Sequence, residues 1–168
     1  MKKALLVIDM QKICVGENHS VYFKYDSEKL IQSVNKVIDE NKDNMVIYIK
    51  NVMTKDTTNK YARFLAFEGT EEAELVDSLH IISKYIFTKN QGDAFSNPEL
   101  DGFLKAHKVD CVEIIGIDGG GCVALTALGA VKAGYSVIVN ESAIGTMFEK
   151  NKEKCFKRLR EAGARFIG

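Results

Sequence analysis

The sequence predicts an α/β fold with a mainly parallel sheet, because segments typical of strands alternate with segments typical of helices. Residues 4–8 are apolar throughout, as expected of a strand that is covered on both faces, and residues 111–115 are a further strong strand candidate. Residues 27–40 carry apolar side chains at helical spacing. A chain of 168 residues suits one core, so we expect a single domain over 1–168.

The first half of the chain supplies three strands and one long helix in this prediction. The first strand is Ala4 to Ile8, and a helix over Ser27 to Glu40 follows, with Ser27 as its N-cap. Met45 to Ile49 is the second strand and Tyr85 to Thr88 is the third. Between these two strands, Asn51 to Thr70 is polar and irregular, so we expect a long functional loop there.

The second half alternates helices and strands in the same way. Asn97 is typical of a helix cap, with Pro98 at the first helical position. Gly134 and Gly163 end the last two predicted helices. After the helix that opens at Pro98, the expected elements are a strand over Cys111 to Ile115, a glycine-rich turn over Gly116 to Gly121, a helix over Cys122 to Ala133, a strand over Ser136 to Val139, a helix over Glu149 to Ala162 and a short sixth strand over Ala164 to Ile167.

Composition and charge argue against several function classes. The 23 basic and 23 acidic residues give a formal net charge of zero, which disfavours nucleic-acid binding and polybasic membrane attachment. Asp9 interrupts the first apolar run too early for a signal peptide, and no run approaches the roughly 20 residues of a membrane span. We therefore expect a cytoplasmic protein with no nucleic-acid or membrane partner, for which homo-oligomerisation is plausible.

Three chemically distinctive residues follow the ends of three different strands. Asp9 follows the first strand, Lys89 follows the third, and Cys122 follows the fourth by way of the glycine-rich turn. The carboxyl ends of parallel strands lie at one edge of a sheet, where the loops form a ligand crevice. The sequence therefore predicts a site at which these three side chains meet.

Their chemistry is that of nucleophilic catalysis. The N-terminus of a helix lowers the pKa of a thiol such as Cys122, and free backbone N–H groups there can stabilise an oxyanion. Lys89 could serve as counter-ion, while Asp9 takes the thiol proton and returns it to a leaving amine. From its position alone, Cys122 could equally well pack between helix and sheet. Asp9 could be a turn residue, and Lys89 could be a solvated loop lysine.

Other familiar sites are absent from the sequence. The four cysteines show neither C-x-x-C nor zinc spacing, so we expect free thiols, with packing roles for Cys111 and Cys155. Cys14 could approach the pocket. The histidines share no metal-ligand spacing, and residues 116–121 do not match the dinucleotide pattern G-x-G-x-x-G. We therefore expect no metal and no cofactor.

Several segments together carry a family pattern. These are Ala4 to Gln11 with its aspartate, Gly69-Thr70 through Val76, Lys89 with Ala94-Phe95 and Leu100, Gly116 through Val123 with Thr126-Ala127, and Gly134 to Val137. In this order, and over nearly the whole chain, they resemble the isochorismatase-like cysteine hydrolases of the nicotinamidase/isochorismatase superfamily. The resemblance implies a single-domain, three-layer α/β/α fold with a six-stranded, mostly parallel sheet, in dimers or tetramers.

The resemblance also implies a reaction and its residues. Asp9, Lys89 and Cys122 would form a catalytic triad that cleaves a C–N bond of a small amide or ureido substrate through a covalent acyl-enzyme. A non-prolyl cis peptide at Ile117-Asp118 is expected, with the backbone N–H groups of Asp118 and Cys122 as the oxyanion hole. Candidate substrate contacts are Gln11, Phe23, Tyr61, Phe64 and Phe95.

The sequence departs from the family pattern at four places, and three of these departures support an alternative. Residues 50–54 lack the Asp-x-His metal motif of nicotinamidases, so a metal-dependent nicotinamidase is not expected. Asp118, Gly119 and Asp93 replace residues usual in the family, and a carboxylate at 118 would raise the pKa of a nearby thiol. The alternative is a catalytically decayed member that acts as a small-molecule binding or regulatory protein. A weaker alternative is a redox protein that pairs Cys122 with Cys14.

Overall fold

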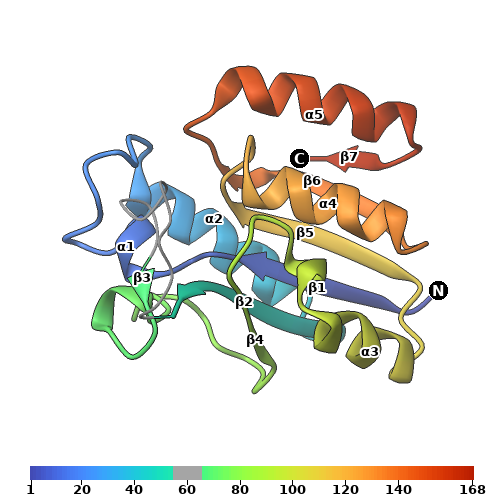
Figure 1. The fold of residues 1–168 in the computed structure, drawn as a ribbon, viewed down its shortest axis with the longest axis horizontal. Coiled ribbons are helices and arrows are strands. Elements are labelled where there is room, and N and C mark those ends of the chain that lie inside the picture. The colour runs from blue at the N-terminus through green and yellow to red at the C-terminus, as the bar shows by residue number, and fades with distance from the viewer. Residues whose placement is uncertain (55–65) are drawn as a thin grey trace.

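The computed structural model describes residues 1–54 and 66–168, and one seven-stranded sheet runs through them (Figure 1). The strands lie in the order β3-β2-β1-β5-β6-β7, and β4 also pairs with β2. Their bounds are β1 (Lys3–Ile8), β2 (Met45–Met53), β3 (Ala66–Phe67), β4 (Ile86–Lys89), β5 (Cys111–Ile117), β6 (Ser136–Gly145) and β7 (Arg165–Ile167). Every pairing between these named strands is parallel, which confirms the predicted mainly parallel sheet.

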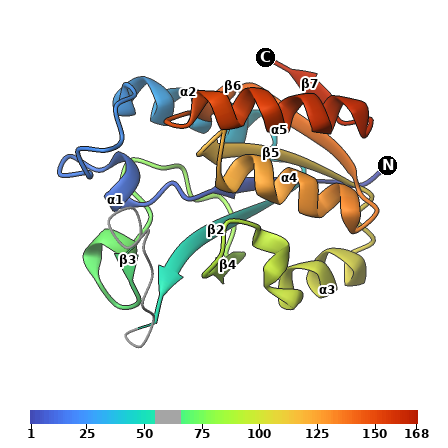
Figure 2. The ribbon, with the colours of Figure 1, turned by 45° about the horizontal axis from the view of Figure 1, so that its top comes forward.

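Helices cover both faces of the sheet, giving three layers (Figure 2). One face packs against α3, α4 and α5, and the other packs against α1 and α2. Their bounds are α1 (Lys12–Val15), α2 (Ser27–Glu40), α3 (Pro98–Ala106), α4 (Cys122–Lys132) and α5 (Glu149–Glu161), with short 3-10 turns at η2 (Glu71–Ala73) and η3 (Ala94–Ser96). The α/β/α architecture expected from the sequence is therefore confirmed.

The central strand β1 shows why the layers form. Its residues 4–8 are fully buried, and alternate side chains enter different hydrophobic clusters. Leu6 and Ile8 pack beneath α3, α4 and α5, whereas Leu5 and Val7 pack beneath α1 and α2. An apolar run without alternation is thus the consequence of burial on both faces.

Several strands are longer than the sequence indicated. β2 continues to Met53, so Asn51 is a strand residue in register with Lys89 of β4 rather than part of a loop. β5 continues through Gly116, which was expected to begin a turn. Gly116 has φ +111°, and a Cβ there would lie 2.1 Å from the carbonyl oxygen of Ile8. The strand can therefore continue beside β1 only because this residue is glycine.

Smaller differences concern caps and short elements. The N-cap of α2 is Asp26, whose side chain accepts a hydrogen bond from the Lys29 amide, rather than Ser27. The sequence indicated neither α1 nor the short elements β3, η2 and η3, because runs of two to four residues carry no periodicity.

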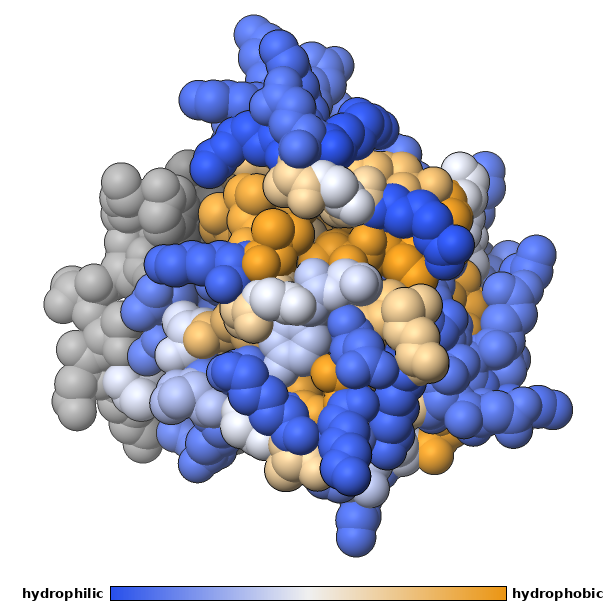
Figure 3. Space-filling model, turned by 90° about the vertical axis from the view of Figure 1, so that its right-hand side faces the viewer, coloured by the Kyte–Doolittle hydropathy of each residue, from blue (hydrophilic) through white to orange (hydrophobic). Residues whose placement is uncertain are grey.

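The carboxyl ends of β1, β4 and β5 point to the end of the molecule away from the one shown in Figure 3. The face in Figure 3, where β1 begins, is mostly hydrophilic around a central hydrophobic area. Among the helices of the described residues, none has the length and apolar character needed to cross a bilayer.

Candidate active site

Asp9 lies at the end of β1, where the chain turns away from the sheet. Its φ of +53° is in the left-handed region, which aspartate tolerates better than most residues. The Asp9 amide donates to the carbonyl oxygen of Ile49 at 2.9 Å, which fixes the turn against β2. The side chain is directed inward and the residue is only 5% exposed.

Lys89, the last residue of β4, forms a buried ion pair with Asp9. Its Nζ donates to Asp9 Oδ2 at 3.1 Å and to the carbonyl oxygen of Gln91 at 3.1 Å. Burial disfavours the ammonium, but the charge of Asp9 and the proximity of Cys122 outweigh it, and the pKa of Lys89 is raised. Lys89 therefore stays cationic inside the protein.

The second oxygen of Asp9, Oδ1, has a different environment. It is buried and has no hydrogen-bond partner within the described residues. Burial raises the pKa of Asp9, although Lys89 and the Cys122 thiol act in the opposite direction. A desolvated carboxylate oxygen with a free lone pair beside a thiol is suited to accept that thiol's proton.

Cys122 is the first residue of α4, as expected, but its pKa differs from the expectation. Burial, and then the charge of Asp9, raise the pKa of the thiol to about 12, and Lys89 offsets only part of this. The net shift is therefore opposite to the lowering expected from the helix N-terminus. Desolvation and a neighbouring carboxylate raise the pKa, so the cysteine rests as a neutral thiol.

Asp118 does not act on the thiol in the way the sequence suggested. Its Oδ1 accepts from the Gly120 amide at 2.8 Å, and its Oδ2 accepts from the Met147 amide. Asp118 is not among the groups that shift the pKa of Cys122. Its carboxylate instead ties the turn between β5 and α4 to the end of β6.

The same turn leaves two backbone N–H groups available. The peptide bond between Ile117 and Asp118 is cis, as the resemblance implies. Within the described chain, the amides of Gly119, Gly120, Gly121 and Val123 all donate to nearby oxygens. Among the residues that the structure describes, neither the Asp118 amide nor the Cys122 amide has such a turn or loop acceptor, and Cys122 lies among the helix-terminal N–H groups that lack intrahelical partners.

The other two departures also have local structural roles. A Cβ at position 119 would lie 2.5 Å from Thr146 Oγ1, so the close packing of this turn against the end of β6 requires Gly119. Asp93 caps η3, because its Oδ1 accepts from the Phe95 amide at 2.8 Å. Each of the three unusual residues, Asp118, Gly119 and Asp93, therefore has a structural explanation.

A cavity of about 590 Å³ opens above these groups. Its wall is mainly apolar, with side-chain amides of exposed residues at the mouth. The lining residues are Asp9, Gln11, Cys14, Phe23, Asn51, Asn90, Gln91, Gly92, Ile117, Asp118, Gly120, Gly121, Cys122, Leu125, Met147, Phe148 and Asn151. A cavity of this size suits a small molecule.

The predicted substrate contacts are distributed unevenly around this cavity. Phe23 is buried and lines it. Gln11 lines it too, but its Nε2 donates to the carbonyl oxygens of Asn51 (3.0 Å) and Ala73 (2.8 Å). Phe95 does not line the cavity and packs against Tyr135, with ring centroids 5.6 Å apart. Two further predicted contacts, Tyr61 and Phe64, lie outside the described residues.

Sequence reasoning missed several residues of the wall. Asn51 comes from β2, and Met147, Phe148 and Asn151 follow β6. The rule that loops gather at the carboxyl edge applies to these two strands as well. Extending it to them would have identified both groups, had the ends of β2 and β6 been placed correctly.

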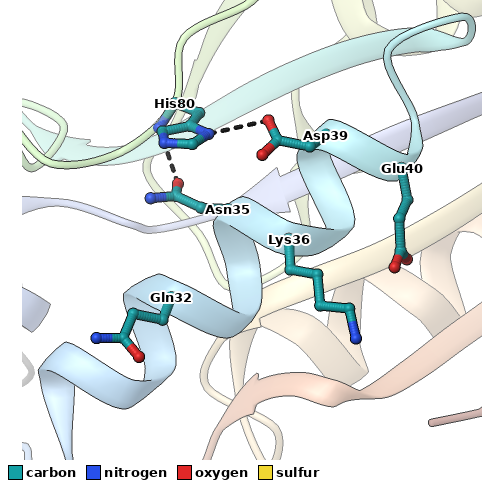
Figure 4. A pocket seen from close by; sticks show the side chains of 6 residues that line it. All are labelled: Gln32, Asn35, Lys36, Asp39, Glu40 and His80. Carbon is teal, nitrogen blue, oxygen red and sulfur yellow. Dashed lines mark hydrogen bonds and ion pairs between the residues drawn. The ribbon is translucent and has the colours of Figure 1, made fainter.

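A second hollow, of about 540 Å³, lies over α2 (Figure 4). His80 Nδ1 lies 2.9 Å from Asp39 Oδ1, and the His80 amide donates to Asn35 Oδ1 at 2.8 Å. These contacts attach the segment before β4 to the helix. In the part of the chain that the structure describes, no cluster of metal-ligating side chains occurs here or elsewhere.

Comparison with known proteins agrees with this architecture. The family model described as the isochorismatase domain matches residues 3–168. N-carbamoylsarcosine amidase from Thermoplasma acidophilum superposes with a TM-score of 0.81 at 26% identity, over 99% of this chain and 96% of that one. Comparison with curated proteins gives no match.

Two further solved structures share the fold. An isochorismatase-like hydrolase from Alkaliphilus metalliredigens has a TM-score of 0.85 at 24% identity, covering 99% of this chain and 95% of its own. A pyrazinamidase/nicotinamidase from Streptococcus mutans has a TM-score of 0.86 at 23% identity, covering 99% and 100%. Because the family model spans almost the full sequence, this chain belongs to the isochorismatase family of hydrolases.

Proposed function

We propose that this protein is a metal-independent cysteine hydrolase that cleaves a C–N bond of a small amide or ureido substrate through a covalent acyl-enzyme on Cys122. The observation that carries the proposal is the buried Asp9 carboxylate, which interacts with the neutral Cys122 thiol and whose Oδ1 has no other hydrogen-bond partner among the described residues. A buried acceptor without a partner is costly, and such groups persist at functional sites. The cavity above the pair provides room for the substrate.

In the first half-reaction, Asp9 accepts the proton of the Cys122 thiol while the sulfur attacks the substrate carbonyl carbon. Burial raises the pKa of Asp9, which makes the carboxylate a stronger base. The amides of Asp118 and Cys122 donate to the developing oxyanion. Asp9 then returns the proton to the leaving nitrogen, so an amine departs and a thioester remains.

In the second half-reaction, a water molecule attacks the thioester carbonyl. Asp9 accepts a proton from this water and delivers a proton to the departing sulfur, which restores the thiol. Lys89 keeps the Asp9 carboxylate oriented throughout, because Nζ holds Oδ2 and leaves Oδ1 free. The net reaction consumes one water and yields an acid and an amine.

The test is turnover of a panel of small amides and ureido compounds, measured as released amine or ammonia. We expect Cys122→Ala to lower turnover by about 10⁴-fold or more, and Cys155→Ala, the matched control on α5, to retain it. Intact mass after rapid quenching should reveal the acyl adduct on Cys122. Activity should persist after dialysis against a chelator. Equal turnover by wild type and Cys122→Ala would refute the proposal.

The raised pKa of Cys122 is the observation that favours the alternative of a small-molecule binding or regulatory protein, because a neutral thiol is not itself a nucleophile. That alternative predicts ligand-dependent thermal stabilisation with equal, negligible turnover by wild type and Cys122→Ala.

The redox alternative predicts a loss of two mass units after mild peroxide treatment, with Cys14 and Cys122 joined in a disulfide. The expected dimer or tetramer stays a prediction, which light scattering would test.

A further inference from the structure

Asn51 lies between the strand that leads to Asp9 and the strand that ends at Lys89, and hydrogen bonds hold its backbone in place. It lies on β2, in register with Lys89 of β4, and is 5% exposed. Gln11 holds its backbone on both sides: the Asn51 amide donates to Gln11 Oε1 at 2.8 Å, and Gln11 Nε2 donates to the Asn51 carbonyl oxygen at 3.0 Å. A side chain on a backbone held in this way has little freedom to move.

The carboxamide of Asn51 contacts Lys89 with both of its polar atoms. Oδ1 accepts from Lys89 Nζ at 3.2 Å, and Nδ2 donates to the Lys89 carbonyl oxygen at 3.2 Å. The reverse orientation would direct an NH₂ group at an ammonium and an oxygen at a carbonyl, so the hydrogen-bond network selects the first. The carboxamide atom nearest Lys89 Nζ also lies 3.7 Å from Cys122 Sγ.

This contact adds a third oxygen acceptor around the ammonium. A lysine ammonium has three N–H donors. Asp9 Oδ2, the carbonyl oxygen of Gln91 and Asn51 Oδ1 supply three oxygen acceptors. Lys89 also forms a side-chain hydrogen bond with Cys122, so the sulfur competes with these oxygens for the three N–H donors.

We propose that Asn51 is a positioning residue that holds the Lys89 ammonium toward Asp9 and thereby keeps Cys122 in its protonated form until a substrate is attacked. The raised pKa of Cys122 is consistent with this role. The inference depends on the geometry around Lys89 and not on turnover. It can therefore fail while the proposed hydrolase activity stands, and the reverse is also true.

The test compares Asn51→Leu with Asn51→Asp, two replacements of similar size. Loss of the acceptor in Asn51→Leu lets Lys89 turn toward sulfur, so alkylation of Cys122 by iodoacetamide at pH 8.5 should be roughly tenfold faster than in wild type. A second carboxylate in Asn51→Asp should make it roughly tenfold slower. Peptide mapping assigns the label to each cysteine, and thermal melting confirms folding.

A merely structural role predicts a different pattern. Both replacements would then loosen the site and accelerate labelling in the same direction, with Cys14 labelled as well. That pattern, or an unchanged rate at Cys122 in folded Asn51→Leu, would overturn the inference. Asn51→Ala also lacks the acceptor and should label faster, so it replaces Asn51→Leu if the leucine prevents folding.

Discussion

Two hollows of this molecule are similar in volume, about 590 Å³ at the carboxyl edge of the sheet and about 540 Å³ over α2, yet they differ in chemistry. Beside each hollow, an acid and a nitrogen base lie within hydrogen-bond distance of each other. At the sheet edge, the side chains of Lys89 and Asp9 are 0% and 6% exposed. Over α2, those of His80 and Asp39 are 50% and 56% exposed.

This difference in burial determines what each pair can do. Water screens an exposed pair, so the pair contributes little to stability. In a desolvated site the same charges interact strongly and shift each other's pKa, which is the condition for acid–base chemistry. The comparison teaches that shape alone does not identify a site. Each of the following predictions tests this contrast.

The largest effects are expected at the buried pair. Asp9→Asn removes the base and should lower turnover by about 10² to 10⁴-fold. Lys89→Met leaves a buried carboxylate without its partner and should lower the free energy of unfolding by about 3–5 kcal/mol, measured by urea denaturation. Combining the two replacements should recover part of that stability, since no charge is then left unpaired.

Lys3 provides the matched control, because it forms a second ion pair at the opposite end of β1. Its Nζ lies 2.6 Å from Glu113 Oε2, far from the cavity lining. Lys3→Met should destabilise the fold and leave turnover per folded molecule unchanged. A similar fall in turnover for Lys3→Met and Asp9→Asn would mean that both act through stability alone.

A second prediction concerns the reactivity of the buried thiol. With a pKa of about 12, Cys122 is almost fully protonated at pH 8.5. Its alkylation by iodoacetamide should be slower than that of a free thiol by a factor on the order of 10² to 10³, and should rise about tenfold per pH unit up to pH 11. A plateau near pH 8 would show that the helix field does lower the pKa and would weaken the contrast between the hollows.

The sequence was sufficient to predict the fold and the strand ends at which Asp9, Lys89 and Cys122 lie. Residues 4–8 are an apolar run, residues 111–115 are apolar apart from Glu113, and parallel topology then brings the residues that follow them to one edge. Asp9 and Lys89 are indeed in contact, and their interactions extend to Cys122. These are consequences of topology, which local patterns report well.

The remaining features depend on distances that the sequence does not encode locally. The pKa of Cys122 follows from how much water is excluded around it, which is a property of the packed site. Asp118 faces backbone amides of its own turn and of the chain after β6, which only the folded loop reveals. Asn51 was assigned to a loop because the apolar pattern of β2 weakens before the strand ends.

A third prediction tests the loop that leads to Cys122. A Cβ at position 120 would lie 2.1 Å from the carbonyl oxygen of Phe148, so Gly120→Ala should lower the free energy of unfolding by about 2–3 kcal/mol. It should also disturb the neighbouring Cys122. Gly102→Ala is the control, because a Cβ there meets nothing within 4 Å in helix α3 and should add about 0.5–1 kcal/mol. Chemical denaturation measures the free energy of unfolding of both variants. Equal stabilities would contradict the close approach of residue 120 to the Phe148 carbonyl oxygen.

The smallest effects are expected in the hollow over α2. His80→Ala removes the contact with Asp39. Because both side chains are about half exposed, the free energy of unfolding should fall by no more than about 1 kcal/mol. Turnover should not change, since none of the residues lining this hollow lines the cavity at the sheet edge. A loss of turnover in folded His80→Ala would show that the exposed pair influences the catalytic edge, and burial would then no longer separate the two hollows.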